Sequence, residues 1–278
     1  MLSHLFSIRA ALLACTLLTQ AMAADPIRIV FQNGRGVDIS AVALQGDTLS
    51  ITQSVDGFTA GQKFPLATAD HIFGDKPAEM NPAMALLLTG KPRESLKLLE
   101  PIVATQKVTA KIPGNFWLDA ARAALVAYAM EGEESKATAI GKDISEATAE
   151  QGNDPFIALG KVLLMPTTTK VEERETAYLD LTTDNQPADL AAYASFFRAE
   201  LLKAAKRDAE ALEAYLKVPC VFPSGGLILN AVAELNAAEY LAAQGRREEA
   251  VALLKSSIRQ SSGTSVSAEA NKRLESLK

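Results

Sequence analysis

The sequence predicts a mainly α-helical protein, an α-solenoid of about five antiparallel helix pairs preceded by a small antiparallel β domain. Two stretches, AELLKAAKRDAEALEAYLK (199–217) and AEYLAAQGRREEAVALLKS (238–256), align without a gap at an offset of 39 residues. Each has apolar residues at three- and four-residue spacing on both sides of a short polar turn, which is the pattern of two antiparallel helices. Because one such pair cannot bury its apolar stripe alone, repeated pairs predict a solenoid.

The first 23 residues predict a secretory signal peptide. Arg9 supplies a positive charge, AALLACTLL (10–18) an apolar run, and Ala21-Met22-Ala23 a small-residue end. The run is shorter than the roughly 20 apolar residues that cross a bilayer. We therefore expect an exported protein, periplasmic or secreted, that does not span a membrane; lipid attachment at Cys15 is the alternative.

The charge of the expected mature chain argues against two classes of partner. Removal of residues 1–23 takes only Arg9 from the 28 basic residues, so the net charge moves from −5 to −6. Nucleic acid calls for a basic face, and an anionic membrane surface attracts basic segments. Cys220 then remains as the single cysteine, which excludes an internal disulfide. We expect Cys220 to be a small buried residue.

Residues 26–75 predict four or five short strands. IRIVF (27–31), VDISAVAL (37–44) and TLSITQ (48–53) are β-branched or alternating runs, and HIF (71–73) closes the series. The turns between them contain Asn-Gly and Gly-Asp, and such close spacing is typical of a small sheet or barrel. The spacing resembles that of the small SH3-like and Sm-like barrels. That resemblance implies no nucleic-acid binding, since the segment is not basic.

The repeated helix pair recurs through residues 76–278. Aligned on their small residues, the copies place turns near positions 90, 132, 172, 206 and 245, so the spacings are 42, 40, 34 and 39 residues. Three segments without the repeat pattern intrude: TAKIPGN (109–115), MPTTTK (165–170) and PCVFPSGG (219–226).

One copy carries a family resemblance. Over residues 192–223, Ala199, Ala211, Tyr215 and Pro223 hold the small, small, aromatic and proline places of the tetratricopeptide repeat. The resemblance to that family covers most of residues 76–278. The repeats here run longer than the family's 34 residues, and its Trp–Leu–Gly opening is absent.

The resemblance implies a concave groove lined by outward residues of each first helix. Carried onto this chain, those residues are Asp119, Arg122, Tyr193, Phe196, Glu200, Lys203 and Glu239. Their mixed charge and two aromatic rings suit an extended peptide. Phe196 also fits the core, as do Phe197 and Trp117.

Catalytic and metal-binding motifs do not stand out. His71 is the single histidine of the expected mature chain, so no Ser–His–Asp or Cys–His set is completed by a second one, and we expect it to be structural. GKPRES (90–95) begins like a phosphate loop, but Pro92 stands where Ser or Thr is needed. Acidic clusters at 131–134 and 172–175 lie near predicted helix starts, where solvated carboxylates favour the helix dipole. We expect no cofactor and no metal.

These observations predict a non-enzymatic, extracytoplasmic scaffold that binds a protein or peptide. The alternative is a structural or assembly subunit of a bacterial-type envelope complex, in which the β region docks and the solenoid spaces its partners. A hydrolase is a third hypothesis, which a reactive serine or a bound metal would favour.

Overall fold

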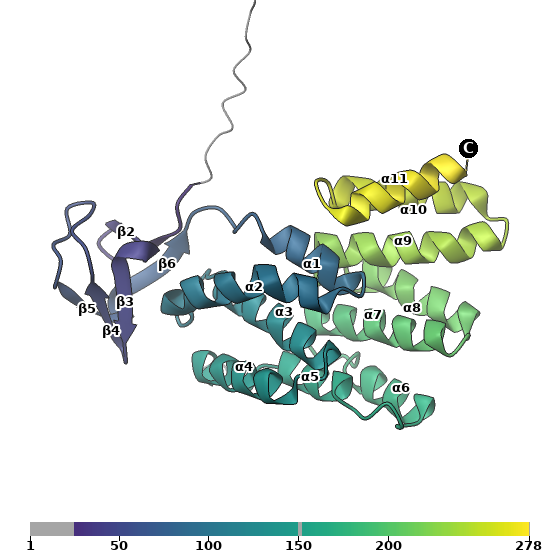
Figure 1. The fold of residues 1–278 in the computed structure, drawn as a ribbon, viewed down its shortest axis with the longest axis horizontal. Helices are drawn as coiled ribbons and strands as arrows, with labels where there is room; N and C mark the ends of the chain where they lie inside the picture. Colours follow the sequence, from purple (N-terminus) through teal and green to yellow (C-terminus); the bar gives the residue numbers. More distant parts are fainter. Residues whose placement is uncertain (1–24, 150–151, 278) are drawn as a thin grey trace, which may run out of the picture.

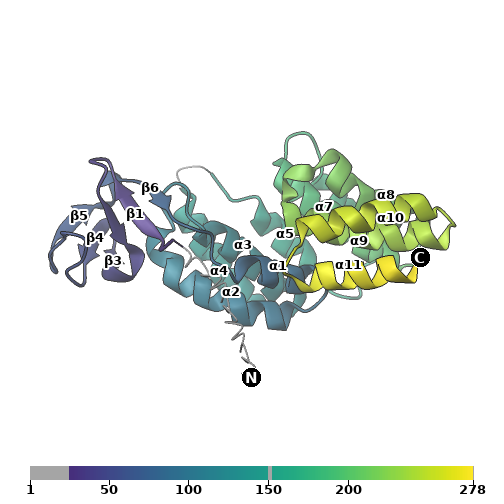
Figure 2. The ribbon, with the colours of Figure 1, turned by 90° about the horizontal axis from the view of Figure 1, so that it is seen from above.

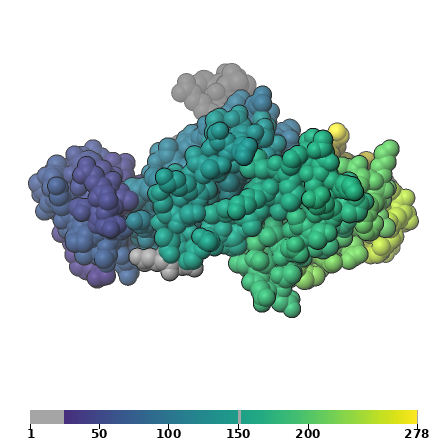
Figure 3. Space-filling view, turned by 90° about the horizontal axis from the view of Figure 1, so that it is seen from below, coloured from purple at the N-terminus to yellow at the C-terminus, as the bar shows by residue number. Residues whose placement is uncertain are grey.

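The computed structural model describes residues 25–149 and 152–277. The β region forms a lobe at one end of an elongated molecule, and the helices fill the rest (Figures 1, 2 and 3). The expected signal peptide, residues 1–23 with Cys15, lies outside the described residues. Among the helices of the described ranges, none is both long and apolar enough to cross a bilayer.

Two three-stranded antiparallel sheets make up the β region. The first has the order β2 (Gly36–Asp38), β1 (Arg28–Phe31), β6 (Ala69–Phe73). The second has the order β3 (Val42–Gln45), β4 (Thr48–Ile51), β5 (Lys63–Pro65). Their apolar faces share one core, in which Ile29, Val37 and Leu49 are fully buried. The expected small antiparallel β domain is therefore present as two small sheets.

The run 37–44 reads as one alternating strand, but the structure divides it. A 3₁₀ turn at Ile39–Ala41 separates β2 from β3 and carries the chain from one sheet to the other. The Asp38 carboxylate accepts hydrogen bonds from the Ser40 backbone N–H at 2.8 Å and from its hydroxyl at 2.6 Å. Such a local side-chain bond offers the backbone an alternative to the strand ladder.

The described residues contain eleven α-helices, which form five sequence-adjacent pairs and a final helix packed on the last pair (Figure 1). The first six are α1 (Met80–Leu88), α2 (Pro92–Gln106), α3 (Trp117–Met130), α4 (Glu134–Ala147), α5 (Phe156–Leu163) and α6 (Val171–Asp180). The remaining five are α7 (Ala188–Ala204), α8 (Asp208–Val221), α9 (Leu227–Ala243), α10 (Arg247–Gln260) and α11 (Ser265–Ser276). The predicted solenoid of about five helix pairs is confirmed.

Four pairs turn through a residue in the left-handed conformation. Gly90, Gly132 and Gly245 have φ of 76°, 71° and 76°, and Lys206 holds the same place at 59°. At each turn the next N–H reaches back five residues, as Arg207 does to the Leu202 carbonyl at 2.9 Å. A helix end closed by such backbone hydrogen bonds has a recognisable sequence pattern. This explains why the turns near 90, 132, 206 and 245 can be predicted from the sequence. The turn expected near 172 instead occupies residues 164–170, before α6 begins.

The solenoid closes on itself. Its first helix, α1, packs against α9 and α11 as well as against its neighbours α2 and α3 (Figures 1 and 2). The inner helices α1, α3, α7 and α9 share one hydrophobic core, and 12 of the 17 residues of α9 are buried, so this helix is enclosed on most sides. Fully buried alanines such as Ala83, Ala127 and Ala199 let the helices approach closely.

The non-repeat segment 109–115 joins the two regions. Ile112 is 1% exposed and packs into the β core. The Ile72 backbone N–H on β6 donates to the Pro113 carbonyl at 3.0 Å, and Lys111 pairs with Asp47 at 3.2 Å. A loop from the helical part therefore completes the β region.

The aromatic residues pack in the core as expected, whereas the expectation that Cys220 is buried was wrong. Trp117, Phe196 and Phe197 are 0%, 1% and 5% exposed, which confirms them as core residues. Cys220 is exposed, because it lies on the last turn of α8 just beyond the buried Val218, where the chain leaves the core.

Glu175 corrects the expectation that the acidic clusters are solvated. Its residue is 8% exposed, and its carboxylate accepts hydrogen bonds from Arg198 at 2.7 Å and from Arg207. These two guanidinium groups come from α7 and from the turn after it, so Glu175 ties α6 to the next helix pair.

Candidate functional site

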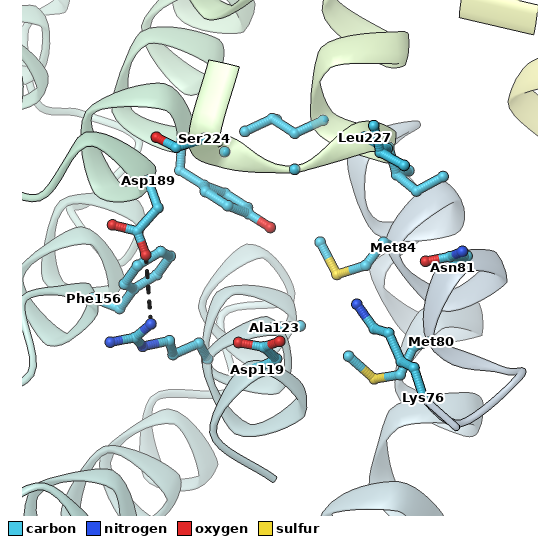
Figure 4. Close-up of a pocket in the computed structure, with 16 residues that line it drawn as sticks. Lys76, Met80, Asn81, Met84, Asp119, Ala123, Phe156, Asp189, Ser224 and Leu227 are labelled. Carbon is cyan, nitrogen blue, oxygen red and sulfur yellow. Dashed lines mark ion pairs between the residues drawn. The ribbon is translucent and has the colours of Figure 1, made fainter. Parts of the chain in front are cut away.

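A cavity of about 380 Å³ lies between the amino-terminal parts of the inner helices α1, α3, α5, α7 and α9 (Figure 4). Its apolar lining includes Met80 and Met84 from α1 and Phe156 from α5. Its polar lining includes Asp119 and Arg122 from α3. The cavity is thus a place where chain segments far apart in sequence present both charge and apolar surface.

Arg122 fixes one wall of the cavity. Its Nε and Nη2 atoms lie 3.0 and 2.6 Å from Oδ2 of Asp154, whose side chain is 1% exposed. Its Nη1 atom lies 3.5 Å from the carboxylate of Asp189 on α7, and its guanidinium lies 4.6 Å from the Phe156 ring centre. The charge of Arg122 is therefore neutralised inside the wall while it ties α3 to α5 and α7.

Asp154 also starts α5. Its Oδ1 atom accepts a hydrogen bond from the Phe156 backbone N–H at 3.0 Å, which satisfies one donor that the helix start leaves free. The Phe156 ring then meets the Tyr193 ring edge to face, with centroids 5.3 Å apart and an interplanar angle of 72°. This geometry is favourable for aromatic pairs and makes a rigid apolar wall.

The Tyr193 hydroxyl stays protonated. Burial raises the pKa of Tyr193 well above its usual value, and the nearby carboxylates of Asp119 and Asp189 raise it further. No other described residue forms a hydrogen bond with this hydroxyl. It is consequently a free donor beside two carboxylates.

Two opposite charges in the cavity lack a protein partner. Asp119 on α3 and Lys76, just before α1, form no hydrogen bond or ion pair with any described residue. Figure 4 shows both side chains extending into the space between α1 and α3. Both residues are exposed, so a ligand can reach them.

The end of the non-repeat segment 219–226, residues 224–226, and Leu227 at the start of α9 form the lip of the cavity. Leu227 and Val221 are 65% and 58% exposed. A Cβ atom at Gly225 would lie 2.5 Å from the Ala192 Cβ and 2.8 Å from the Leu229 Cδ2, so only glycine lets the lip approach α7 this closely. Gly226, at φ of 101°, then turns the chain into α9.

The seven residues expected to line the groove separate into two groups. Asp119, Arg122 and Tyr193 line the cavity. Phe196, Glu200, Lys203 and Glu239 do not. Phe196 packs edge to face against Phe197 and Tyr215.

The three charged members of the second group lie elsewhere on the inner helices. Glu200 accepts hydrogen bonds from the Tyr215 hydroxyl and from the Asn236 amide, the latter at 3.2 Å. Lys203 is exposed near the end of α7, and Glu239 pairs with Arg273 on α11 at 2.9 Å. Glu239 also lines a separate cavity of about 320 Å³ between α9, α10 and α11.

Sequence reasoning missed the residues that complete the cavity: Lys76, Met80, Met84, Phe156, Ser224 and Leu227. Two local signals point to some of them. Asp154-Pro155 is a helix-start pattern that places Phe156, and Gly225-Gly226 after Pro223 marks a turn that presents Leu227. The methionines carry no such signal, because their role depends on α1 reaching α9.

The histidine of the described residues lies away from the cavity. His71 is exposed on β6, where its Nδ1 atom lies 2.8 Å from the Asp70 carboxylate. Within residues 25–149 and 152–277, no group of three or more His, Cys, Asp or Glu side chains is placed to hold a metal ion. Comparison of the chain with protein-family models, with curated proteins and with solved structures yields no match.

Proposed function

We propose that this protein is a non-enzymatic, extracytoplasmic scaffold that binds a peptide segment of a partner protein in the cavity between α1, α3, α7 and α9. One observation supports the proposal most directly. The cavity combines the partnerless carboxylate of Asp119, a Phe156–Tyr193 wall and the exposed apolar lip at Leu227.

The size and shape of the site favour a peptide. A volume of about 380 Å³ is at the small end of ligand pockets, so it holds one or two side chains rather than a large cofactor. Leu227 lines the cavity and is 65% exposed, so its apolar surface is also accessible from outside, where neighbouring residues of an extended segment would lie. A rigid wall held by the Arg122–Asp154 pair reduces the ordering that binding requires.

Selection from a displayed peptide library tests this function. Ser224 is exposed at the lip, so Ser224→Trp narrows the entrance without filling the core. Leu179→Trp, on the exposed face of α6, is the matched control. We expect peptides that bind the wild type and Leu179→Trp but lose binding to Ser224→Trp. Failure to enrich any peptide, or enrichment that survives Ser224→Trp, would contradict the proposal.

An assembly subunit is the second candidate. The β region lies at one end of the molecule, and Phe73 at the end of β6 is 55% exposed (Figure 2). A partner that docks on the β lobe would depend on Phe73 and would be indifferent to Ser224→Trp. Binding with that dependence would favour this candidate over the cavity scaffold.

A further inference from the structure

The cavity indicates which side chain its ligand carries. Resting on the function proposed above, we infer that the bound segment presents a basic side chain to Asp119, with an apolar neighbour against Leu227. The occupant is therefore a cationic and apolar stretch of a partner protein, recognised through a lysine or arginine.

The charged residues in and around the cavity favour a basic ligand. Asp154 and Asp189 already surround Arg122, at 2.6 and 3.5 Å from its guanidinium nitrogens. Asp119 and Lys76 are the two charged residues of the cavity without a partner among the described residues. Together with the buried Asp154, which holds Arg122 but does not line the cavity, three carboxylates stand against the two cations Arg122 and Lys76. A cation beside Asp119 would balance the excess negative charge.

The amino-terminal ends of α3 and α7, which carry the carboxylates of the cavity, do not reverse this preference, although the first turns of α1 and α9 contain no acidic residue. A helix start favours an anion, since its free N–H groups carry partial positive charge. Asp119 and Asp189 already stand in the first turns of α3 and α7 and meet that preference there.

The apolar walls of the cavity suit the methylene stem of a basic side chain. A lysine or arginine has a long methylene stem that gains from apolar contact while its charged end meets a carboxylate. Met80 and Met84 provide an adaptable surface on one side, and the Phe156 and Tyr193 rings provide a rigid one on the other. Aromatic faces also attract a cation directly.

The lip of the cavity offers an exposed apolar surface to a neighbouring residue of the ligand. The described residues expose four large apolar side chains, those of Phe73, Leu179, Val221 and Leu227. Leu227 lines the cavity, and Val221 lies six residues before it in the sequence. A residue next to the basic one in an extended segment keeps its side chain outside the cavity, where the exposed part of the Leu227 side chain is accessible.

Calorimetric titration of the full chain tests the inference. The probes are three capped pentapeptides, acetyl-Gly-Leu-X-Leu-Gly-amide, with lysine, norleucine or glutamate at X. We expect the lysine peptide to bind most tightly. Asp119→Asn should weaken that binding about fivefold, the effect of removing one partly exposed ion pair. Lys76→Gln should leave it unchanged or strengthen it.

Asp208→Asn is the control for Asp119→Asn. Like Asp119, Asp208 carries an exposed carboxylate in the first turn of a helix, here α8. It lies outside the cavity. We expect this variant to bind the lysine peptide as the wild type does.

The signs of these effects separate the outcomes. Tightest binding of the glutamate peptide, weakened by Lys76→Gln and strengthened by Asp119→Asn, would overturn the basic occupant and leave the peptide scaffold standing. Equal binding of the lysine and norleucine peptides would overturn it as well. Absence of binding by the lysine peptide also overturns it, and the displayed-library selection then decides whether the proposed function fails too.

Discussion

Arg122 on α3 holds the buried carboxylate of Asp154 through two hydrogen bonds to the same oxygen, at 3.0 and 2.6 Å. The two residues stand 32 positions apart in sequence, on either side of α4. Their pair positions the Phe156 ring, and hence one wall of the cavity, before any ligand arrives.

Loss of Asp154 should destabilise the helical region. Asp154→Ala leaves Arg122 without its main partner and α5 without its first hydrogen-bond acceptor, so we expect the free energy of unfolding to fall by about 3 kcal/mol. Urea unfolding monitored by circular dichroism measures this. Arg93→Ala is the control, because the Arg93 side chain is 79% exposed in its pair with Glu131. An equal loss of unfolding free energy in the two variants would show that the buried pair contributes no more to stability than the exposed one.

The turn at Lys206 should accept glycine with a gain. Lys206 has φ of 59°, a conformation that a side chain disfavours by about 1–2 kcal/mol, whereas glycine adopts it freely but loses more chain entropy on folding. We expect Lys206→Gly to raise the free energy of unfolding by about 0.5 kcal/mol. Gly245→Ala, at φ of 76° in the equivalent turn, should lower it by about 1 kcal/mol. A loss of stability in Lys206→Gly would mean that the lysine side chain makes a compensating contact.

Glu234 on α9 should make stability depend on pH. Glu234 is 6% exposed, and burial raises its pKa above the ordinary value of 4.5, although hydrogen bonds from Ser256 and Gln260 oppose the rise. A carboxyl group with a raised pKa in the folded state stabilises below pH 4.5 and loses that contribution as the pH rises through the folded value.

The variant Glu234→Gln removes this titration. Its stability relative to the wild type should therefore increase from pH 4 towards neutrality and then level off. Thermal unfolding at a series of pH values measures the difference, with the exposed Glu248→Gln as control. A difference that is constant with pH would contradict the burial account.

Ile112 should stabilise the β region from outside it. The Ile112 side chain is 1% exposed within the β core, so Ile112→Ala removes a buried contact worth about 3 kcal/mol and leaves a void. Hydrogen exchange should show faster opening of β1 and β4, while α7 and α9 keep their protection. Equal acceleration in both regions would mean that the two parts unfold as one unit.

The helix pairs could be predicted because their signals are local. The apolar spacing and the glycine turns at Gly90, Gly132 and Gly245 each act within one repeat. The β strands were readable for the same reason, except where the Asp38 side chain breaks a run.

The cavity depends on long-range packing, so only part of it could be predicted. The resemblance to tetratricopeptide repeats pointed to Asp119, Arg122 and Tyr193, but the sequence does not show how closely α1 approaches α9. The approach of α1 to α9 brings Met80 and Met84 into the wall of the cavity, whereas Phe196 is covered by Phe197 and by Tyr215 on α8. Cys220 was misplaced because the apolar character of a residue does not reveal where the last helical turn leaves the core.

The measurement that tests the central claim most directly is methyl NMR of the methionines in the full chain, titrated with acetyl-Gly-Leu-Lys-Leu-Gly-amide. Met80 and Met84 line the cavity, whereas Met130 and Met165 pack elsewhere against the helical core and serve as internal references. We predict saturable shifts at Met80 and Met84, reduced in Asp119→Asn, with Met130 and Met165 unchanged. Shifts confined to Met130 and Met165, or a spectrum that the peptide leaves unaltered, would contradict a peptide-binding cavity with a basic occupant.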